Sequence, residues 1–257
     1  MKEELIKIRN KYIKPTTQYW YYDDKVAKFL LEVINKATPH DCPDFYYIKD
    51  GICYICEYFQ FDASKNTRKG SSLKRAEKDS ERKINEQTKI VLEKIQYNKH
   101  SITDCGAFFE NVECVQNKHY WKDNFIKIFN DHYVNIINYK KNLLHNKIIN
   151  KNTKVKNIFI IEDTTELGAF INKNAECVCY PICFDFGIDT LKKATEIDYV
   201  IFLNSAIREM ILIDRNIFKN MQSKLDFDQC EMFFFNKMVN IVAMVVVPDK
   251  LLKKDKQ

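Results

Sequence analysis

The stretch CPDFYYIKDGICYICEYFQFD, residues 42–62, carries the signals from which we predict the fold. Two runs rich in Ile, Tyr, Phe and Cys, Phe45–Ile48 and Ile52–Phe61, flank a Lys-Asp-Gly turn. Aromatic and β-branched residues favour strands, and an Asp-Gly pair between two such runs is typical of a hairpin turn. We therefore predict an antiparallel hairpin with Asp44 at the head of its first strand and Glu57 inside the second.

Glu57 is an acidic residue among apolar neighbours. Side chains alternate between the two faces of a strand, so Glu57 shares its face with Ile55 and Phe59. A carboxylate buried there must be paired, protonated or bound to a cation, because an isolated buried charge is very costly. If Asp44 lies across the hairpin, a divalent ion between the two carboxylates relieves their repulsion, and Mg²⁺ prefers such oxygen ligands together with water. A solvated or lysine-paired Glu57 is the alternative.

Helical patterns precede and follow the hairpin. Apolar periodicity and the positions of prolines predict a short helix over Lys2–Lys14 and a buried helix that starts after Asp23-Asp24, holds Glu32 and ends before Pro39. Two longer helices are predicted after the hairpin, from Ser71 or Ser72 to about Tyr97 and from about Tyr120 to Asn146.

The second half of the chain reads as strands with one short helix. The predicted helix is Thr190–Thr195, and the predicted strands are Asn157–Ile161, Val178–Phe184, Tyr199–Leu203, Met210–Ile213, Met232–Phe235 and Val239–Val247. The fold class is therefore mixed α/β, a central mixed sheet with a lobe of long helices. The polar, basic segment Asn150–Lys156 divides residues 1–150, the hairpin and the long helices, from residues 151–257, which complete the sheet or form a second lobe.

Composition limits the class of protein. A chain of 257 residues that is 46% hydrophobic, with only five glycines and five prolines, can bury a large core and has few flexible linkers. Its longest apolar run is far too short to cross a bilayer, so we expect no membrane partner. Nine cysteines, an odd number without a preceding secretory leader, favour a reduced cytoplasmic protein. Cys53 and Cys56 point to opposite faces of a strand, which favours core packing over zinc binding.

A basic segment follows the hairpin directly. On a helix, Lys74, Lys78 and Arg82 recur every four residues along one stripe, and Arg68 and Arg75 lie close to it. Cations on one face can contact a nucleic-acid backbone without reading bases. Acidic residues are interleaved with them, however, so an ordinary solvated helix with local ion pairs is the alternative.

The order of these features resembles the PD-(D/E)XK nuclease-like superfamily. Pro43-Asp44 is followed thirteen positions after Asp44 by Glu57, and the hairpin lies between a helix holding Glu32 and the helix from Ser72. The resemblance covers about residues 23–95. It implies a restriction-endonuclease-like core and Mg²⁺-dependent cleavage of DNA or RNA, with Asp44 and Glu57 as metal ligands and Glu32 or Asp62 assisting.

The sequence departs from that superfamily at one position. The superfamily's lysine, two positions after the Glu, is Phe59 here, so Lys69 or Lys74 would have to supply the catalytic cation. The competing hypothesis is a noncatalytic binding or assembly protein with a degenerate nuclease-like fold. Its aromatic and cysteine-rich faces would then form a partner interface or a homodimer.

Three further patterns admit two interpretations each. Asp62 either joins the metal site or caps the turn after its strand, and the turn is favoured. Glu162-Asp163 either completes a metal site or begins a helix, and the helix is favoured. The four aromatics Tyr19–Tyr22 are expected to pack as a cap on the core and not to form a base-stacking platform.

Overall fold

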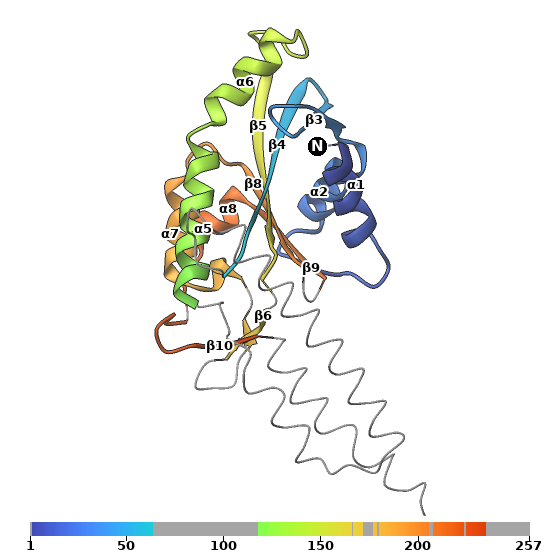
Figure 1. Cartoon of the computed structure of the whole chain (residues 1–257). Helices are drawn as coiled ribbons and strands as arrows, with labels where there is room; N and C mark the ends of the chain where they lie inside the picture. The colour runs from blue at the N-terminus through green and yellow to red at the C-terminus, as the bar shows by residue number, and fades with distance from the viewer. Residues whose placement is uncertain are drawn as a thin grey trace, which may run out of the picture.

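A seven-stranded mixed sheet forms the centre of the computed structural model, which describes residues 2–63, 118–165, 167–171, 177–178, 180–205, 208–223 and 225–234. Helices cover both faces of this sheet, so the mixed α/β class predicted from the sequence is confirmed (Figure 1). The strands, in their order across the sheet, are β1 (Gln18–Tyr21), β9 (Glu209–Asp214), β8 (Tyr199–Asn204), β5 (Lys154–Asp163), β4 (Ile52–Phe61), β3 (Phe45–Lys49) and β2 (Thr38–Pro39).

The predicted hairpin is present at one side of this sheet. β3 and β4 pair antiparallel, with Phe45 opposite Cys56 and Lys49 opposite Ile52. Asp50 and Gly51 in the turn have φ values of 50° and 73°, a left-handed conformation that suits an Asp-Gly pair. The register places Asp44 one position before the ladder begins.

The middle of the sheet consists of parallel strands. β5 pairs with β4 along its whole length, from Lys154 opposite Ile52 to Asp163 opposite Phe61, and β8 lies parallel on the other side of β5. β5 is buried on both faces, which explains its continuous apolar run. Since β4 precedes residue 150 and β5 follows it, residues on both sides of that position belong to one sheet.

Two N-terminal helices cover one face of the sheet, α1 (Lys2–Tyr12) and α2 (Asp24–Lys36). The Asp23 side chain caps α2 by accepting hydrogen bonds from the backbone N–H groups of Lys25 and Val26. Both helices bury their apolar sides, and the residues that fill this layer include Leu5, Ile8, Tyr12, Leu30, Val33, Cys56, Ile158, Ile160, Ile201 and Leu203.

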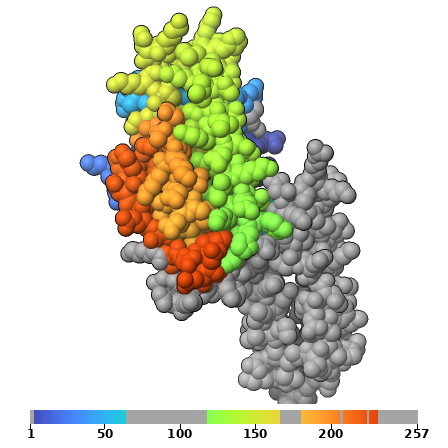
Figure 2. Space-filling model, turned by 90° about the vertical axis from the view of Figure 1, so that its left-hand side faces the viewer, coloured from blue at the N-terminus to red at the C-terminus, as the bar shows by residue number. Residues whose placement is uncertain are grey.

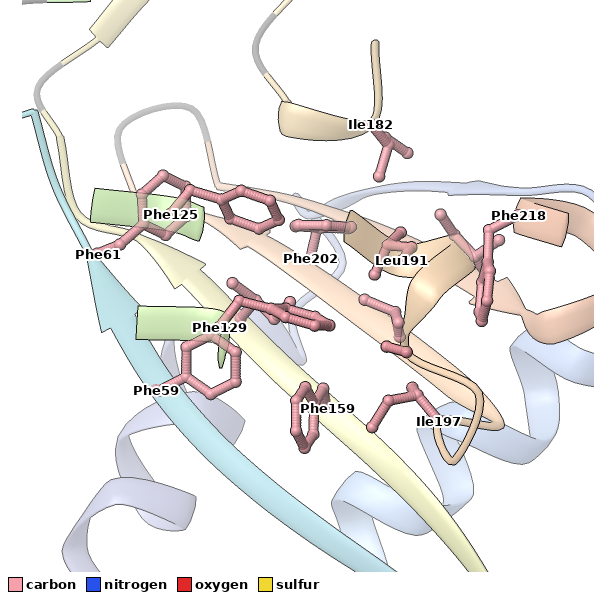
Figure 3. Close-up of a cluster of buried hydrophobic side chains, with 14 of the residues drawn as sticks. Phe59, Phe61, Phe125, Phe129, Phe159, Ile182, Leu191, Ile197, Phe202 and Phe218 are labelled. Atoms are coloured by element: carbon pink, nitrogen blue, oxygen red, sulfur yellow. The ribbon is translucent and has the colours of Figure 1, made fainter. Parts of the chain in front are cut away.

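Four other helices lie on the opposite face, α5 (Lys118–Tyr133), α6 (Ile136–His145), α7 (Asp185–Lys193) and α8 (Arg215–Asn220). The core beneath them is largely aromatic. In Figure 3, Phe59 and Phe61 of β4 face Phe125 and Phe129 of α5, and Phe159 of β5 lies beside them. Glu57 lies on the same face of β4 as Phe59, so its carboxylate is directed toward α5 and α6 and away from α1 and α2.

The structure differs from the predicted elements at four places. The helix predicted over Tyr120–Asn146 is interrupted between α5 and α6. Only β7 (Cys177–Val178) forms within the predicted strand Val178–Phe184, because Pro181 begins a 3-10 turn, η1 (Pro181–Cys183), and proline cannot donate to a strand ladder. The short helix is α7, which begins and ends earlier than Thr190–Thr195.

The fourth difference concerns the aromatic run Tyr19–Tyr22, which does not form a packed cap. It lies on the edge strand β1, where Trp20 is 56% exposed and Tyr22 is 65% exposed. β1 is at the edge of the sheet and pairs parallel with β9 alone within the described residues, and Tyr21, between Trp20 and Tyr22, is also exposed.

A small second sheet completes the described structure. β6 (Leu167–Ile171) pairs antiparallel with both β7 and β10 (Glu231–Phe234). The segments predicted as a helix from Ser72 and as a strand over Val239–Val247 lie outside the described residues. Among the helices of the described ranges, none has the length and apolar character needed to cross a membrane.

Candidate functional site

The hairpin brings Asp44 and Glu57 together at the place where β3 begins. Phe45 pairs with Cys56, so Asp44 and Glu57 occupy the next positions of the two chains. The Asp44 side chain extends the hydrogen bonding between β3 and β4 by one step, because its Oδ2 accepts a 2.8 Å hydrogen bond from the backbone N–H of Tyr58. The two carboxylates are close enough for the charge of Glu57 to act on Asp44.

Two side chains from the helical layer hold Glu57. Its Oε1 atom lies 2.8 Å from His132 Nδ1 and accepts a 2.8 Å hydrogen bond from the Tyr139 hydroxyl. His132 belongs to the last turn of α5 and Tyr139 to the first turns of α6, so the break between these helices turns both groups toward the same oxygen. Glu57 is 7% exposed, and these contacts are the pairing that a buried carboxylate requires.

Asp44 is a poor place for a negative charge. Burial, and then the charge of Glu57, raise the pKa of Asp44 to about 7, whereas the Tyr58 N–H opposes that rise. Within the described residues, neither Asp44 Oδ1 nor Glu57 Oε2 receives a hydrogen bond. Two like-charged, half-satisfied carboxylates side by side form an electrostatic arrangement that a cation would relieve.

His132 also lies over the position at which the sequence departs from the nuclease superfamily. Its imidazole stacks on the Phe59 ring, with 4.5 Å between centroids and 12° between planes. Phe59 itself is buried against Phe129 and Phe159. The space beside Glu57 where a lysine would extend is therefore occupied by an aromatic ring with a histidine above it.

Glu32 does not join the pair. It projects from α2, on the other face of the sheet, and binds Lys36 at 2.8 Å, Lys49 at 2.5 Å and the Tyr47 hydroxyl at 2.9 Å. Lys36 and Lys49 together with Tyr47 lower the pKa of Glu32 to about 2. Its partner Lys49 is opposite Ile52, five residues and about 16 Å before Glu57 along β4, and its partner Tyr47 is opposite Tyr54, three residues before Glu57.

Asp62 does not join the Asp44–Glu57 pair either. It follows β4 five residues after Glu57, about 16 Å along the strand. Its main-chain carbonyl accepts a 2.8 Å hydrogen bond from Asn124 of α5, and its charge acts on Asp163 at the end of β5. Of the four acids predicted as metal ligands, the structure brings only Asp44 and Glu57 together, whereas Glu32 projects from α2 and Asp62 follows the end of β4. No group of three or more His, Cys, Asp or Glu side chains suited to a metal occurs among the residues described.

The predicted cations cannot be placed beside the pair. The candidates for the catalytic cation, Lys69 and Lys74, lie outside the described residues, and so do the predicted nucleic-acid contacts Arg68, Arg75, Lys78 and Arg82.

The second acidic cluster does not begin a helix, contrary to the prediction. Asp163 Oδ1 accepts the N–H of Thr165 in a tight turn, Asp163 Oδ2 accepts the indole N–H of Trp121 at 2.7 Å, and the chain continues into strand β6. On the opposite face, Glu162 accepts hydrogen bonds from side chains of α1 and β4: Lys11, Tyr12, Tyr58 and Gln60. Both carboxylates are engaged by protein donors, which is a structural role.

The cysteines of the hairpin pack as small apolar side chains. Cys53 and Cys56 are fully buried on opposite faces of β4, as predicted, and both are free thiols. Burial raises the pKa of each thiol, which disfavours the reactive thiolate.

Sequence reasoning identified the two acids and missed their partners. His132 and Tyr139 are seven residues apart, a spacing that places both on one side of a helix. The only available signal was the requirement that a buried Glu57 be paired, and that requirement does not say which donor meets it. Comparisons of the chain with models of protein families, with curated proteins and with solved structures gave no match.

Proposed function

We propose that the protein is a metal-dependent phosphodiesterase acting on nucleic acid, with Asp44 and Glu57 as the metal ligands. The observation that carries the proposal is the convergence of these two carboxylates at the start of β3, each with one oxygen that accepts no hydrogen bond from the described residues. Mg²⁺ is commonly held by one or two carboxylates, with water and substrate phosphate completing its shell, so the pair suits this ion.

The order of elements supports the same proposal. Helix α2 precedes the hairpin β3–β4, and α5 and α6 connect it to β5, which is parallel to β4. This succession resembles the restriction-endonuclease-like core implied by the sequence, in which the acidic pair lies on the hairpin.

Different residues of the chain would have different roles in the proposed reaction. When bound, a divalent ion would lower the pKa of a water molecule and neutralise charge on a phosphate. The Tyr58 N–H orients Asp44, while His132 and Tyr139 hold Glu57 Oε1 and leave Oε2 for the ion. The cation that stabilises the developing charge on phosphate would come from Lys69 or Lys74.

The structure suggests a direct test with matched controls. Plasmid DNA, linear duplex, single-stranded DNA and RNA would each be incubated with the protein and Mg²⁺ or Mn²⁺, against EDTA. Asp44→Asn and Glu57→Gln should each lower cleavage by about 100-fold or more, since both remove a ligand. Glu32→Gln, which removes an acid on the other face of the sheet, and Asp62→Asn, which removes an acid about 16 Å along the strand from Glu57, should cleave as the parent protein does.

Metal affinity gives a readout that does not depend on activity. Titration of Mn²⁺ by calorimetry should show binding that Asp44→Asn and Glu57→Gln weaken and that Glu32→Gln leaves unchanged, with circular dichroism showing that each variant is folded. Equal losses of cleavage in all four variants would refute the assignment of the pair.

A noncatalytic binding protein is the second candidate. It is favoured by Phe59, which fills the position of the superfamily's lysine, and by the engagement of Glu57 with His132 and Tyr139. Nucleic-acid binding without cleavage in any of the metals would support it.

A further inference from the structure

Residues 132–161 are unusual in charge. They contain six lysines and no aspartate or glutamate, although 35 acidic residues occur in the 257-residue chain. A stretch of this length would carry about four acids at that average frequency. The stretch includes the basic segment Asn150–Lys156, which the proposed function does not use.

The fold places most of these lysines on one surface. α6 buries Ile136, Tyr139 and Leu143 against the sheet, so the remaining sides of the helix face solvent. The turn after α6 and the first residue of β5 continue that surface at the end of the molecule, where side chains of this segment project in Figure 2. We call it the α6 basic surface, and it consists of the exposed residues Lys140, Lys141, Lys147, Lys151 and Lys154.

These five lysines have no ion-pair partner among the residues that the structure describes. By contrast, Lys11, Lys36 and Lys49 bind Glu162 or Glu32. Lys156 is excluded because its Nζ contacts Tyr199. Five unpaired cations with no acid in the same stretch of chain produce a positive potential that favours a polyanion.

Two residues next to lysines of the α6 basic surface contact the segments that carry the Asp44–Glu57 pair. Tyr139, next to Lys140, donates to Glu57, and Asn146, next to Lys147, contacts the His40 ring at 3.0 Å. The His40 N–H in turn donates to the Asp44 carbonyl at 2.8 Å. Both ends of α6 therefore contact the segments that carry the two acids.

We propose that the α6 basic surface binds the sugar–phosphate backbone of a nucleic acid and directs it to the Asp44–Glu57 pair, an inference that rests on the proposed function. α6 has 10 residues and is about 15 Å long, which matches about four phosphates of one strand. Asparagines alternate with the lysines at positions 138, 142, 146, 150 and 152, and side-chain amides donate to phosphate and sugar oxygens.

An anionic membrane fits this surface less well. A helix that lies on a bilayer inserts its apolar side among the lipids, whereas Ile136, Tyr139 and Leu143 of α6 are packed on the sheet. Ile137 is the one apolar residue of α6 that is largely exposed, at 66%, and a single apolar side chain beside Lys140 and Lys141 is a small anchor for a lipid surface.

The test compares two variants with the same loss of charge. The first replaces Lys140, Lys141, Lys147 and Lys151 by Gln. The second replaces Lys7, Lys25, Lys193 and Lys219 by Gln, which are also exposed but belong to α1, α2, α7 and α8. Binding of a fluorescein-labelled 30-base-pair DNA duplex, and of a duplex RNA of equal length, would be measured by anisotropy in EDTA at several salt concentrations.

The α6 variant should lose at least about 10-fold in affinity, and the slope of log K against log salt should decrease by about 3, close to 0.9 for each phosphate contact removed. The control variant should bind nearly as the parent protein does. Equal losses in the two variants, unchanged binding in the α6 variant, or no binding of nucleic acid by the parent protein would each overturn the proposal. So would binding of phosphatidylserine vesicles through these lysines in the absence of nucleic-acid binding.

Glu57→Gln separates this inference from the proposed function. It should bind the duplex as the parent protein does while losing cleavage. If the parent protein binds through the α6 basic surface but cleaves nothing with Mg²⁺ or Mn²⁺, the proposed function fails and the surface assignment stands. If cleavage depends on Glu57 but the α6 variant binds normally, the surface assignment fails alone.

Discussion

At the scale of single residues, two buried glutamates of the central sheet differ in the hydrogen bonds that they accept. Glu57 and Glu162 are both acidic residues inside apolar strands, 7% and 4% exposed. Glu57 keeps one oxygen without a donor from the described residues, whereas Glu162 accepts from four side chains. Because Glu57 has an oxygen that accepts no hydrogen bond from the described residues, whereas both oxygens of Glu162 accept, we propose a function for Glu57 and assign a structural role to Glu162.

Replacing Glu162 by Ala should lower the free energy of unfolding by about 3 kcal/mol. Lys11, Tyr12 and Tyr58 would lose the carboxylate to which they donate hydrogen bonds. Burial alone raises the pKa of Glu162, but hydrogen bonds led by those from Lys11 and Tyr12 bring it below the ordinary value. Urea denaturation measures the effect. Glu32→Ala is the control, and its loss should be much smaller and reduced further by salt, since its lysine partners are solvent-exposed.

Asp163 should make stability depend on pH. Burial raises its pKa to about 7, from an ordinary value of 3.8. Between these two values the folded protein retains a proton that the unfolded chain releases, so the free energy of unfolding falls as pH rises, by at most about 1.4 kcal/mol per pH unit. In Asp163→Asn this contribution is absent. Urea denaturation at pH 4.5, 5.5, 6.5 and 7.5 should therefore show a shallower decline for the variant, and parallel curves would contradict the assignment.

At the scale of elements, the structure divides the helix predicted over Tyr120–Asn146 into α5 and α6. The α5–α6 break directs His132 and Tyr139 at one oxygen of Glu57, and the Tyr139 hydroxyl also lies 3.3 Å from the His132 carbonyl. The two residues lie on either side of the break, His132 in the last turn of α5 and Tyr139 in the first turns of α6, so the break is next to the candidate site.

A second close contact joins η1 to α7. Gly187 packs so closely that an added Cβ would lie 2.0 Å from the Pro181 carbonyl oxygen. We expect Gly187→Ala to destabilise the protein by about 3 kcal/mol, because backbone on both sides must move. Gly51→Ala is the matched control: its Cβ would have nothing within 4 Å, so only its φ of +73° is unfavourable, about 1 kcal/mol. Chemical denaturation of both variants checks the difference, and equal losses would contradict it.

At the scale of the whole molecule, one sheet joins segments that are distant in sequence. β1, residues 18–21, pairs with β9, residues 209–212, and β5 crosses the boundary that composition suggested at Asn150–Lys156. Helices from the first half of the chain cover both faces of this sheet.

The protein should consequently unfold in one transition. In a Trp20→Phe variant, fluorescence reports on Trp121 alone, because the chain has two tryptophans. Trp121 belongs to α5 and is fully buried against Phe61 of β4, so its signal follows the core. The urea midpoint from Trp121 fluorescence should equal the midpoint from far-UV circular dichroism. Two separated midpoints would indicate that residues 1–150 and 151–257 behave as independent lobes.

The sequence by itself determined the hairpin, the two acids and the mixed α/β class. These follow from local physics: alternation and aromatic content favour strands, an Asp-Gly pair suits a left-handed turn, and a carboxylate among apolar neighbours needs a partner. Asp44 and Glu57 could be paired because a hairpin's register depends on its own turn. The strand rise alone could have separated Asp62, which is five residues after Glu57 along the same strand, whereas separating Glu32 required knowledge of how α2 packs on the sheet.

Only the tertiary structure decided the partners. His132 and Tyr139 come from helices about 75 residues and more away from Glu57 along the chain, and no local propensity specifies such a contact. The grouping of five lysines next to the acidic pair depends on how α6 packs against the sheet. Several arrangements of these helices are compatible with local propensity. Packing between distant segments determines which one forms, because burial of the aromatic core under α5 and α6 contributes more free energy than the secondary-structure propensity of any single segment.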